Sequence, residues 1–109
     1  MAKLVQTLEG DFNQILNKIE AGILKGSISA TLEGITDFRQ GDARCSVRVF
    51  ERYSAMGQNR VSLNVTLFQH GDGPIRLSAI TSGGSQAVFF KVNTIGEENF
   101  LRKLKEILY

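Results

Sequence analysis

The sequence has very few of the residues that cross-link or metallate small proteins. Its 109 residues include one cysteine, Cys45, and one histidine, His70. A single thiol excludes an intramolecular disulfide, and one thiol with one imidazole is too few for a closed transition-metal site. We therefore expect no metal and no other cofactor, and a chain that is stabilised by its hydrophobic core alone.

Long apolar segments are also missing. No run approaches the roughly 20 apolar residues that cross a bilayer, and residues 1–8 lack the basic-then-apolar pattern of a secretory signal. Hydrophobic residues make up 42% of the chain and charged residues 22%, an ordinary balance for a globular protein. These features predict one soluble domain over residues 1–109, located in the cytoplasm of a bacterium and without a membrane partner.

No group of residues has a spacing that is typical of catalysis. Nothing in the chain supports a nucleophile–base pair between Cys45 and His70, and no two carboxylates occupy neighbouring positions on one strand face. His70 and Asp72 lie in the segment QHGDG at 69–73, whose composition is that of a tight turn. We expect no catalytic residue, and the balance favours a protein that is not an enzyme.

Two segments have the periodicity of amphipathic helices. The first begins after Asp11, which forms a capping-box pattern with Gln14, and ends near Gly26. The second begins near Thr94, which has the same spacing to Glu97, and closes the chain. The apolar stripe of the second helix comprises Phe100, Leu101, Leu104, Ile107 and Leu108.

Between the helices, apolar residues recur at every second position, which is typical of half-buried antiparallel strands. The pattern covers residues 28–33, 44–50, 60–67 and 75–79, with a short strand at 4–8 and an optional last one at 87–93. We expect turns between these runs at residues 37–42, 55–59 and 70–73. The order βαββββ(β)α predicts an α+β fold, with a curved antiparallel sheet of five to six strands and two helices on one face. The inward residues of this prediction include Ile28, Cys45, Val47 and Val49.

Loop lengths predict which residues of neighbouring strands face one another. A three-residue loop at 70–72 pairs Leu67 with Ile75, and a five-residue loop at 55–59 pairs Arg48 with Thr66. A slip of one residue would turn every side chain of a strand to the opposite face. The predicted composition of each face therefore depends on these two loops.

This register gives the sheet a polar face that is rich in arginine. Arg48, Arg52 and Arg76 lie on it together with Phe50, and the strands contribute no acidic residue to it. Arginine and aromatic side chains can bind phosphates and stack on bases. The alternatives are a solvated face without a specific role and a face that pairs with a second subunit.

A glycine pair near the end of the last predicted strand is the second candidate. Its backbone amides and the neighbouring hydroxyls could hold an anion, although a turn or a bulge explains two glycines equally well. The segment comprises Ser82, Gly83, Gly84 and Ser85.

Three segments carry a resemblance to a known family: RCSVRVFERYS at 44–54, NRVSLNVTL at 59–67 and LSAITSGGSQ at 77–86. Over nearly its whole length, the chain resembles a small uncharacterised family of single-domain proteins from Gram-positive anaerobic bacteria and their relatives. The family has no established activity, so the resemblance implies no functional residue. The order of elements is also similar to the TATA-binding-protein-like and helix-grip folds, an analogy that does not fix function.

Two functions of different class stay open. The first is a non-enzymatic binding or interaction domain that uses the arginine-rich sheet face. Its ligand would be an anion, including a polyanion such as nucleic acid, or a protein partner, including a second copy of the chain. The alternative is a small-molecule pocket of helix-grip type, which needs more inward aliphatic surface than the helices fill.

Overall fold

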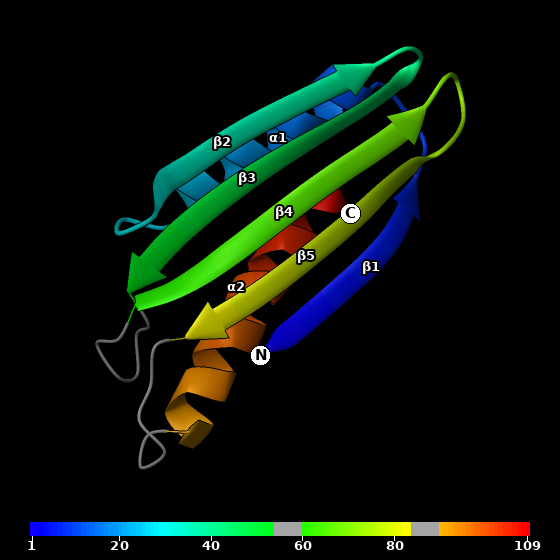
Figure 1. Cartoon of the computed structure of the whole chain (residues 1–109). Coiled ribbons are helices and arrows are strands. Elements are labelled where there is room, and N and C mark those ends of the chain that lie inside the picture. Colours follow the sequence, from blue (N-terminus) through cyan, green and yellow to red (C-terminus); the bar gives the residue numbers. More distant parts are fainter. Residues whose placement is uncertain (54–59, 84–89) are drawn as a thin grey trace.

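A computed structural model describes residues 1–53, 60–83 and 90–109, the last range with its side chains from residue 98 onward. Helices and strands follow one another in the order βαββββα. They are β1 (Ala2–Leu8), α1 (Phe12–Gly26), β2 (Thr31–Gln40), β3 (Ala43–Tyr53), β4 (Arg60–His70), β5 (Ile75–Gly83) and α2 (Phe90–Leu108). The strands form a five-stranded antiparallel sheet in the order β1-β5-β4-β3-β2 (Figure 1).

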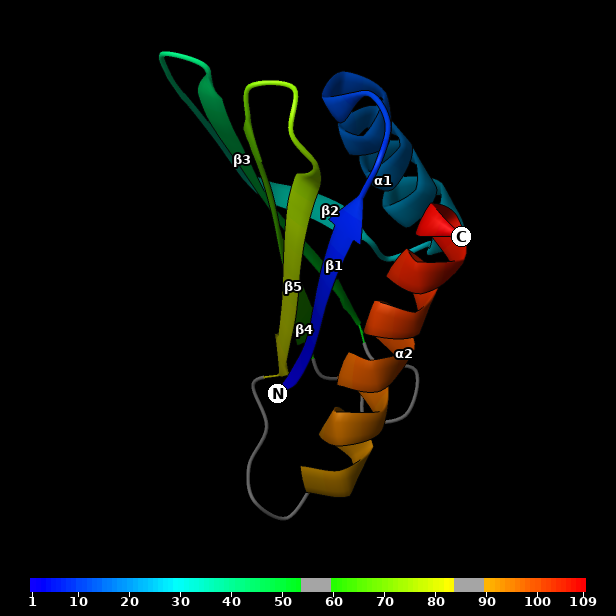
Figure 2. The same ribbon diagram turned by 90° about the vertical axis from the view of Figure 1, so that its right-hand side faces the viewer.

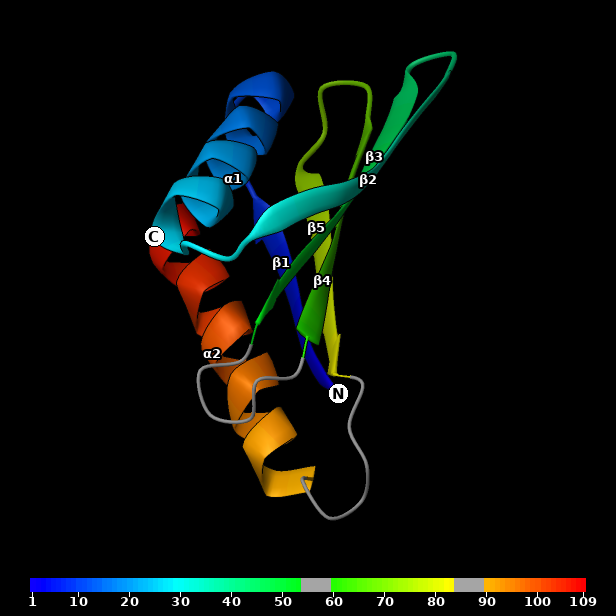
Figure 3. The ribbon, with the colours of Figure 1, turned by 90° about the vertical axis from the view of Figure 1, so that its left-hand side faces the viewer.

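Both helices lie on one face of the sheet, which we call the inner face (Figure 2). Helix α2 packs against β5, β4 and β1, whereas α1 packs against α2 and against β2 and β4. Seen from the other side, the opposite face carries no helix of the described residues (Figure 3), and we call it the outer face. The predicted fold class, with two helices on one face of an antiparallel sheet, is confirmed.

The first helix begins and ends where the sequence predicts. The Asp11 carboxylate accepts a hydrogen bond of 2.9 Å from the backbone N–H of Gln14, which satisfies a backbone donor that the helix leaves unpaired. The side chains that α1 buries follow helical spacing and are Phe12, Leu16, Ile19 and Ile23.

The second helix starts earlier than predicted. It begins at Phe90, so Thr94 lies inside it and the predicted capping box there is wrong. The optional strand at 87–93 is wrong over residues 90–93, which are helical, and residues 87–89 lie outside the described ranges. Aromatic and β-branched residues favour strands only weakly against tertiary context. The C-terminal stripe is confirmed, because Phe100, Leu101 and Leu104 are buried.

The hydrophobic core lies between the helices and strands β1, β4 and β5. Every second residue of β4 and β5 points into it, as the alternation predicts. These inward residues are Val61, Leu63, Val65 and Leu67 on β4 and Ile75, Leu77 and Ala79 on β5.

Strand β2 begins later and extends further than predicted. It runs to Gln40, and the chain turns at Gly41, whose φ of 57° suits glycine. Asp37 therefore belongs to a strand and not to a turn. Ile28, predicted to point inward, is fully exposed in the connection between α1 and β2. The edge position and a register shift between Leu32 and Gly34 explain why this strand lacks a clear alternation.

The two predicted registers differ from the observed ones in opposite ways. Leu67 pairs with Leu77 and not with Ile75, a shift of two residues that leaves each side chain on its predicted face. Arg48 pairs with Val65 and not with Thr66, a shift of one residue that turns all of β3 over. The cause is that β3 continues to Tyr53, which pairs directly with Arg60.

Candidate functional site: the outer face of the sheet

The inverted register places Arg48 on the inner face, where it is 6% exposed. Its Nε donates to Glu20 of α1 at 2.7 Å, and its Nη1 donates to Asp37 of β2 at 3.0 Å. Burial lowers the pKa of Arg48, but the hydrogen bonds to the two carboxylates outweigh burial and raise it. The prediction that Arg48 lies exposed without acidic neighbours is therefore wrong, because Glu20 and Asp37 come from other elements.

Asp37 is held in its charged form by the same cluster. Hydrogen bonds from Ser46 and from Arg48 lower the pKa of the Asp37 carboxyl below its usual value. Ser46 is itself buried on the inner face of β3, directly opposite Asp37. The inner face near β2 thus contains a polar cluster made of an arginine, two carboxylates and a hydroxyl.

Phe50 and Arg52 also lie on the inner face. Phe50 is 0% exposed and belongs to the core, so its predicted place on the polar face is wrong. The guanidinium of Arg52 lies 4.4 Å from the ring centroid of Phe100 on α2, a favourable cation–π geometry. Burial lowers the pKa of Arg52, and nearby Arg102 lowers it further. The predicted position of Arg52 on the exposed polar face is wrong as well.

Two further arginines of the sheet also contact partners. Arg44 lies 3.9 Å over the ring of Phe12 and donates a hydrogen bond of 2.8 Å to Asn13, both on α1. Arg60, at the start of β4, forms an ion pair with Glu51 on the adjacent strand β3. Of the three arginines predicted to share a polar face, only Arg76 is found on the exposed outer face.

The serine–glycine segment is described only in its first half. Ser82 is half-buried, and its hydroxyl lies 2.8 Å from that of Ser62 on the adjacent strand. Gly83 ends β5, and residues 84–85, which include the predicted Gly84 and Ser85, lie outside the described residues. The described part joins two strands, and its role in binding stays a prediction.

The outer face is built from rows of residues that cross the sheet from β2 to β1. Strand register defines each row, because directly paired residues point to the same side. The first row consists of Phe38, Cys45, Phe68, Arg76 and Thr7. The second row consists of Thr36, Val47, Thr66, Ser78 and Val5, and the third of Gly34, Val49, Asn64, Ile80 and Lys3.

Apolar and hydroxyl side chains dominate these three rows. Phe38 is 64% exposed and Phe68 is 42% exposed, and Val5 and Ile80 are exposed as well. Cys45 and the two valines of β3, predicted to be core residues, are only half-buried here. The rows contain two cations, Lys3 and Arg76, and no acidic residue.

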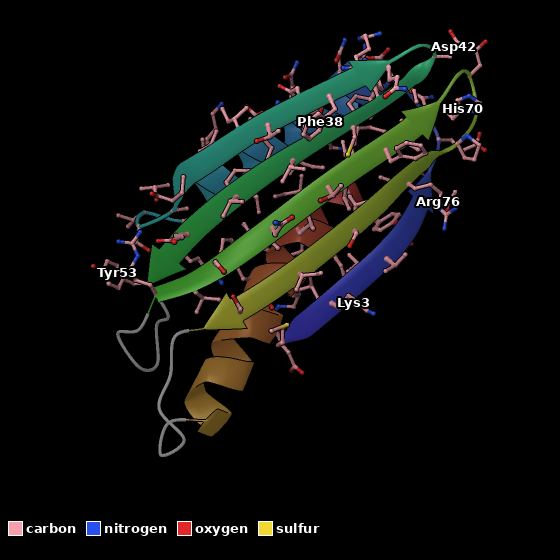
Figure 4. The ribbon with its side chains drawn as sticks, in the orientation of Figure 1. Lys3, Phe38, Asp42, Tyr53, His70 and Arg76 are labelled. Carbon is pink, nitrogen blue, oxygen red and sulfur yellow. The ribbon has the colours of Figure 1, made fainter. Side chains whose placement is uncertain are left out.

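A shallow apolar hollow lies at the β2 end of the first row. Its volume is about 200 Å³, and its lining includes Phe38, Cys45 and Phe68. Figure 4 shows Phe38 on β2, whereas Lys3 and Arg76 lie on the β5–β1 side. Phe38 was missed as a surface aromatic because the sequence assigned it to a turn; the alternation of Ile35 and Asp37 with Thr36 and Phe38 was the available signal.

The hairpin tips meet at one end of the sheet. The N–H of Gly71, in the β4–β5 turn, donates a hydrogen bond of 2.8 Å to the carbonyl oxygen of Asp42 in the β2–β3 turn. The predicted turn around His70 is confirmed. Within the part of the chain that the structure describes, no three His, Cys, Asp or Glu side chains come together.

These features define a class: an α+β protein whose antiparallel sheet is covered by helices on one face and bare on the other in the described residues. The chain belongs to the family of unknown function DUF6054, whose model matches residues 1–109. This confirms the predicted membership of an uncharacterised family, while its distribution among Gram-positive anaerobes stays a prediction. Comparisons with curated proteins and with solved structures gave no match.

None of the helices in the described residues is both long enough and apolar enough to cross a membrane.

Proposed function

We propose that the protein is a non-enzymatic interaction domain that binds a protein partner through the outer face of its sheet. The observation that carries this proposal is the composition of the three rows. Solvated sheet faces usually mix charges of both signs, whereas these rows contain two cations and no acidic residue. The centres of protein interfaces are depleted in charge and enriched in aromatic residues.

The exposed apolar side chains of the outer face support the same proposal. Phe38 and Phe68 lie in one row on either side of Cys45, with Val47 and Val49 half-buried beside them on β3. A contiguous apolar surface on a soluble protein marks an interaction site, whereas single exposed apolar residues need no explanation. Hydroxyl groups between the apolar ones offer hydrogen bonds to a partner surface.

A polyanion is a weaker candidate than the sequence alone implied. Tight binding to nucleic acid requires several simultaneous phosphate contacts. Arg48 is neutralised by two carboxylates, and Arg60 pairs with Glu51. In the rows of the outer face this leaves Lys3 and Arg76, which could support an anionic ligand only in combination with stacking on Phe38 or Phe68.

The helix-grip pocket has less support. Side chains from both helices and from the sheet meet in the described core, where Ile19, Phe50 and Phe100 are fully buried. Such packing favours a filled interior over a ligand cavity.

Site-specific photocrosslinking in cells that express the chain tests the proposal. The photoreactive amino acid p-benzoylphenylalanine replaces Phe68 on the outer face in one variant and Ile28, which is exposed in the connection between α1 and β2, in the matched control. We expect a protein adduct from position 68, its loss when Asn64→Lys is added, and no such adduct from position 28. An adduct with nucleic acid, or equal protein adducts from both positions, would contradict the proposal.

A further inference from the structure

The outer face has roughly the area that a stable protein interface needs. Strands about 4.8 Å apart and residues about 3.4 Å apart give the three rows and their immediate surroundings an area of roughly 600 Å². The chain exposes 6654 Å² in all. Two such faces packed together would bury roughly 1,200 Å², the lower end of the range for specific interfaces. A second sheet would cover this face, whereas a single extended peptide would cover only one part of it.

The chemical features of the face are divided about β4, the central strand of the sheet. The two cations, Lys3 and Arg76, lie on β1 and β5, on one side of β4 (Figure 4). The most exposed ring of the rows, Phe38, lies on β2, on the other side. β4 itself contributes Asn64, Thr66 and Phe68, which carry no charge.

A two-fold axis parallel to β4 makes this division self-complementary. Rotation about such an axis leaves each row opposite the same row, but it places β1 opposite β2 and β5 opposite β3. Arg76 of each copy then lies opposite Cys45 and between the rings of Phe38 and Phe68 of the other copy. A guanidinium beside aromatic rings is attractive, and the two copies of Phe68 meet near the axis as an aromatic pair.

The other face-to-face arrangement is electrostatically worse. An axis across the strands would place β1 and β5 of one copy opposite β1 and β5 of the other. Lys3 and Arg76 of both copies would then gather at one edge of the interface, where their like charges repel. The parallel axis separates the two pairs of cations.

We infer that the outer face binds a second copy of this chain, sheet against sheet, about a two-fold axis along β4. Aligned packing of two sheets about 10 Å apart is a common arrangement for faces of this composition. The inference rests on the proposed function, because it names the protein partner of the same surface.

Sedimentation equilibrium of the full chain over a wide concentration range tests self-association. We expect the mass to rise with concentration from the chain mass of 12.0 kDa to twice that value. Asn64→Lys places two lysines face to face near the axis and should hold the mass at that of the monomer, while Ile28→Lys, matched in charge, should not. Circular dichroism checks that both variants are folded. Asn64→Lys adds a cation, so it would strengthen any binding to nucleic acid while it weakens the dimer.

A charge swap tests the position of the axis. Arg76→Glu alone should weaken dimerisation at least tenfold, and the double variant Arg76→Glu/Phe38→Arg should recover most of that loss. The two positions are separated by three strand spacings, about 14 Å, within one chain, so recovery requires contact between copies. A double variant that is no better than the single one would overturn the assigned axis.

The remaining outcomes separate this inference from the proposed function. A mass that stays at 12.0 kDa at every concentration overturns the dimer. The same applies to a dimer that Asn64→Lys leaves intact, because its interface lies elsewhere. In both cases the proposed function still stands if photocrosslinking at Phe68 yields an adduct with another protein.

Discussion

On the inner face of the sheet, arginines are held against the helices: Arg48 lies between Glu20 and Asp37, and Arg44 and Arg52 lie over aromatic rings. On the outer face, valine, threonine and phenylalanine are exposed or half-buried, and the rows hold two cations. Over residues 44–49 of β3 the polar residues are thus the covered ones and the apolar residues face outward. The difference shows that burial of a strand residue follows from what the opposing element offers, and a carboxylate on α1 makes an arginine suitable for the covered side.

The largest expected difference between the faces comes from replacing one arginine on each face with glutamate. Arg48→Glu places a third carboxylate beside Glu20 and Asp37 and should destabilise the protein by about 3 to 5 kcal/mol. Arg76→Glu, on the exposed outer face, should change the free energy of unfolding by less than about 0.5 kcal/mol. Urea denaturation at low protein concentration measures both. Equal losses in the two variants would show that the faces do not differ as described.

Two neighbouring residues of β4 give a comparison of apolar side chains. Leu67 is fully buried on the inner face, so Leu67→Ala should cost about 2 to 5 kcal/mol. Phe68 points to the outer face, and Phe68→Ala should cost less than about 1 kcal/mol in the monomer. The measurement is again urea denaturation at low protein concentration. A larger loss of stability from Phe68→Ala than from Leu67→Ala would show that Phe68, and not Leu67, faces the core.

Acid should weaken the polar cluster of the inner face. The pKa of Asp37 is lowered in the folded protein by its hydrogen bonds to Ser46 and Arg48. Its contribution to stability is therefore fully present above the unfolded carboxyl pKa of about 3.9 and is lost as the pH falls from there through the folded value. Unfolding measured at pH 6 and pH 3 should show a smaller acid-induced loss for Asp37→Asn than for the original chain. Equal losses would exclude Asp37 as a source of acid sensitivity.

The smallest expected effect concerns Cys45, which the alternation of β3 assigned to the core. Because the thiol is half-buried on the outer face, it should react with a thiol-specific disulfide reagent in the folded monomer. Cys45→Ser should change stability by less than about 1 kcal/mol. If the rate of labelling instead rises only in proportion to the unfolded fraction as denaturant is added, Cys45 is buried in the folded protein.

Local patterns alone determined much of this protein. The Asp11 cap, the four buried positions of α1, the stripe of α2 and the inward residues of β4 and β5 all follow from spacing within one element. A helix cap involves residues three positions apart, and a strand's alternation is set by its own pleat. The predicted fold class followed from these elements and their order, and so did the expectation that the sheet would expose one face.

Only the tertiary structure decided which side of β3 is covered. Register between strands depends on where pairing begins, and Tyr53 pairs directly with Arg60, one residue away from the predicted start. The carboxylates that make the inner face acceptable to Arg48 lie 28 and 11 positions away, on α1 and β2. The alternation of a strand divides its residues into two sets but does not indicate which set faces the helices. That choice was made by these distant charges and by the one-residue register, and it turned a predicted arginine surface into the apolar outer face.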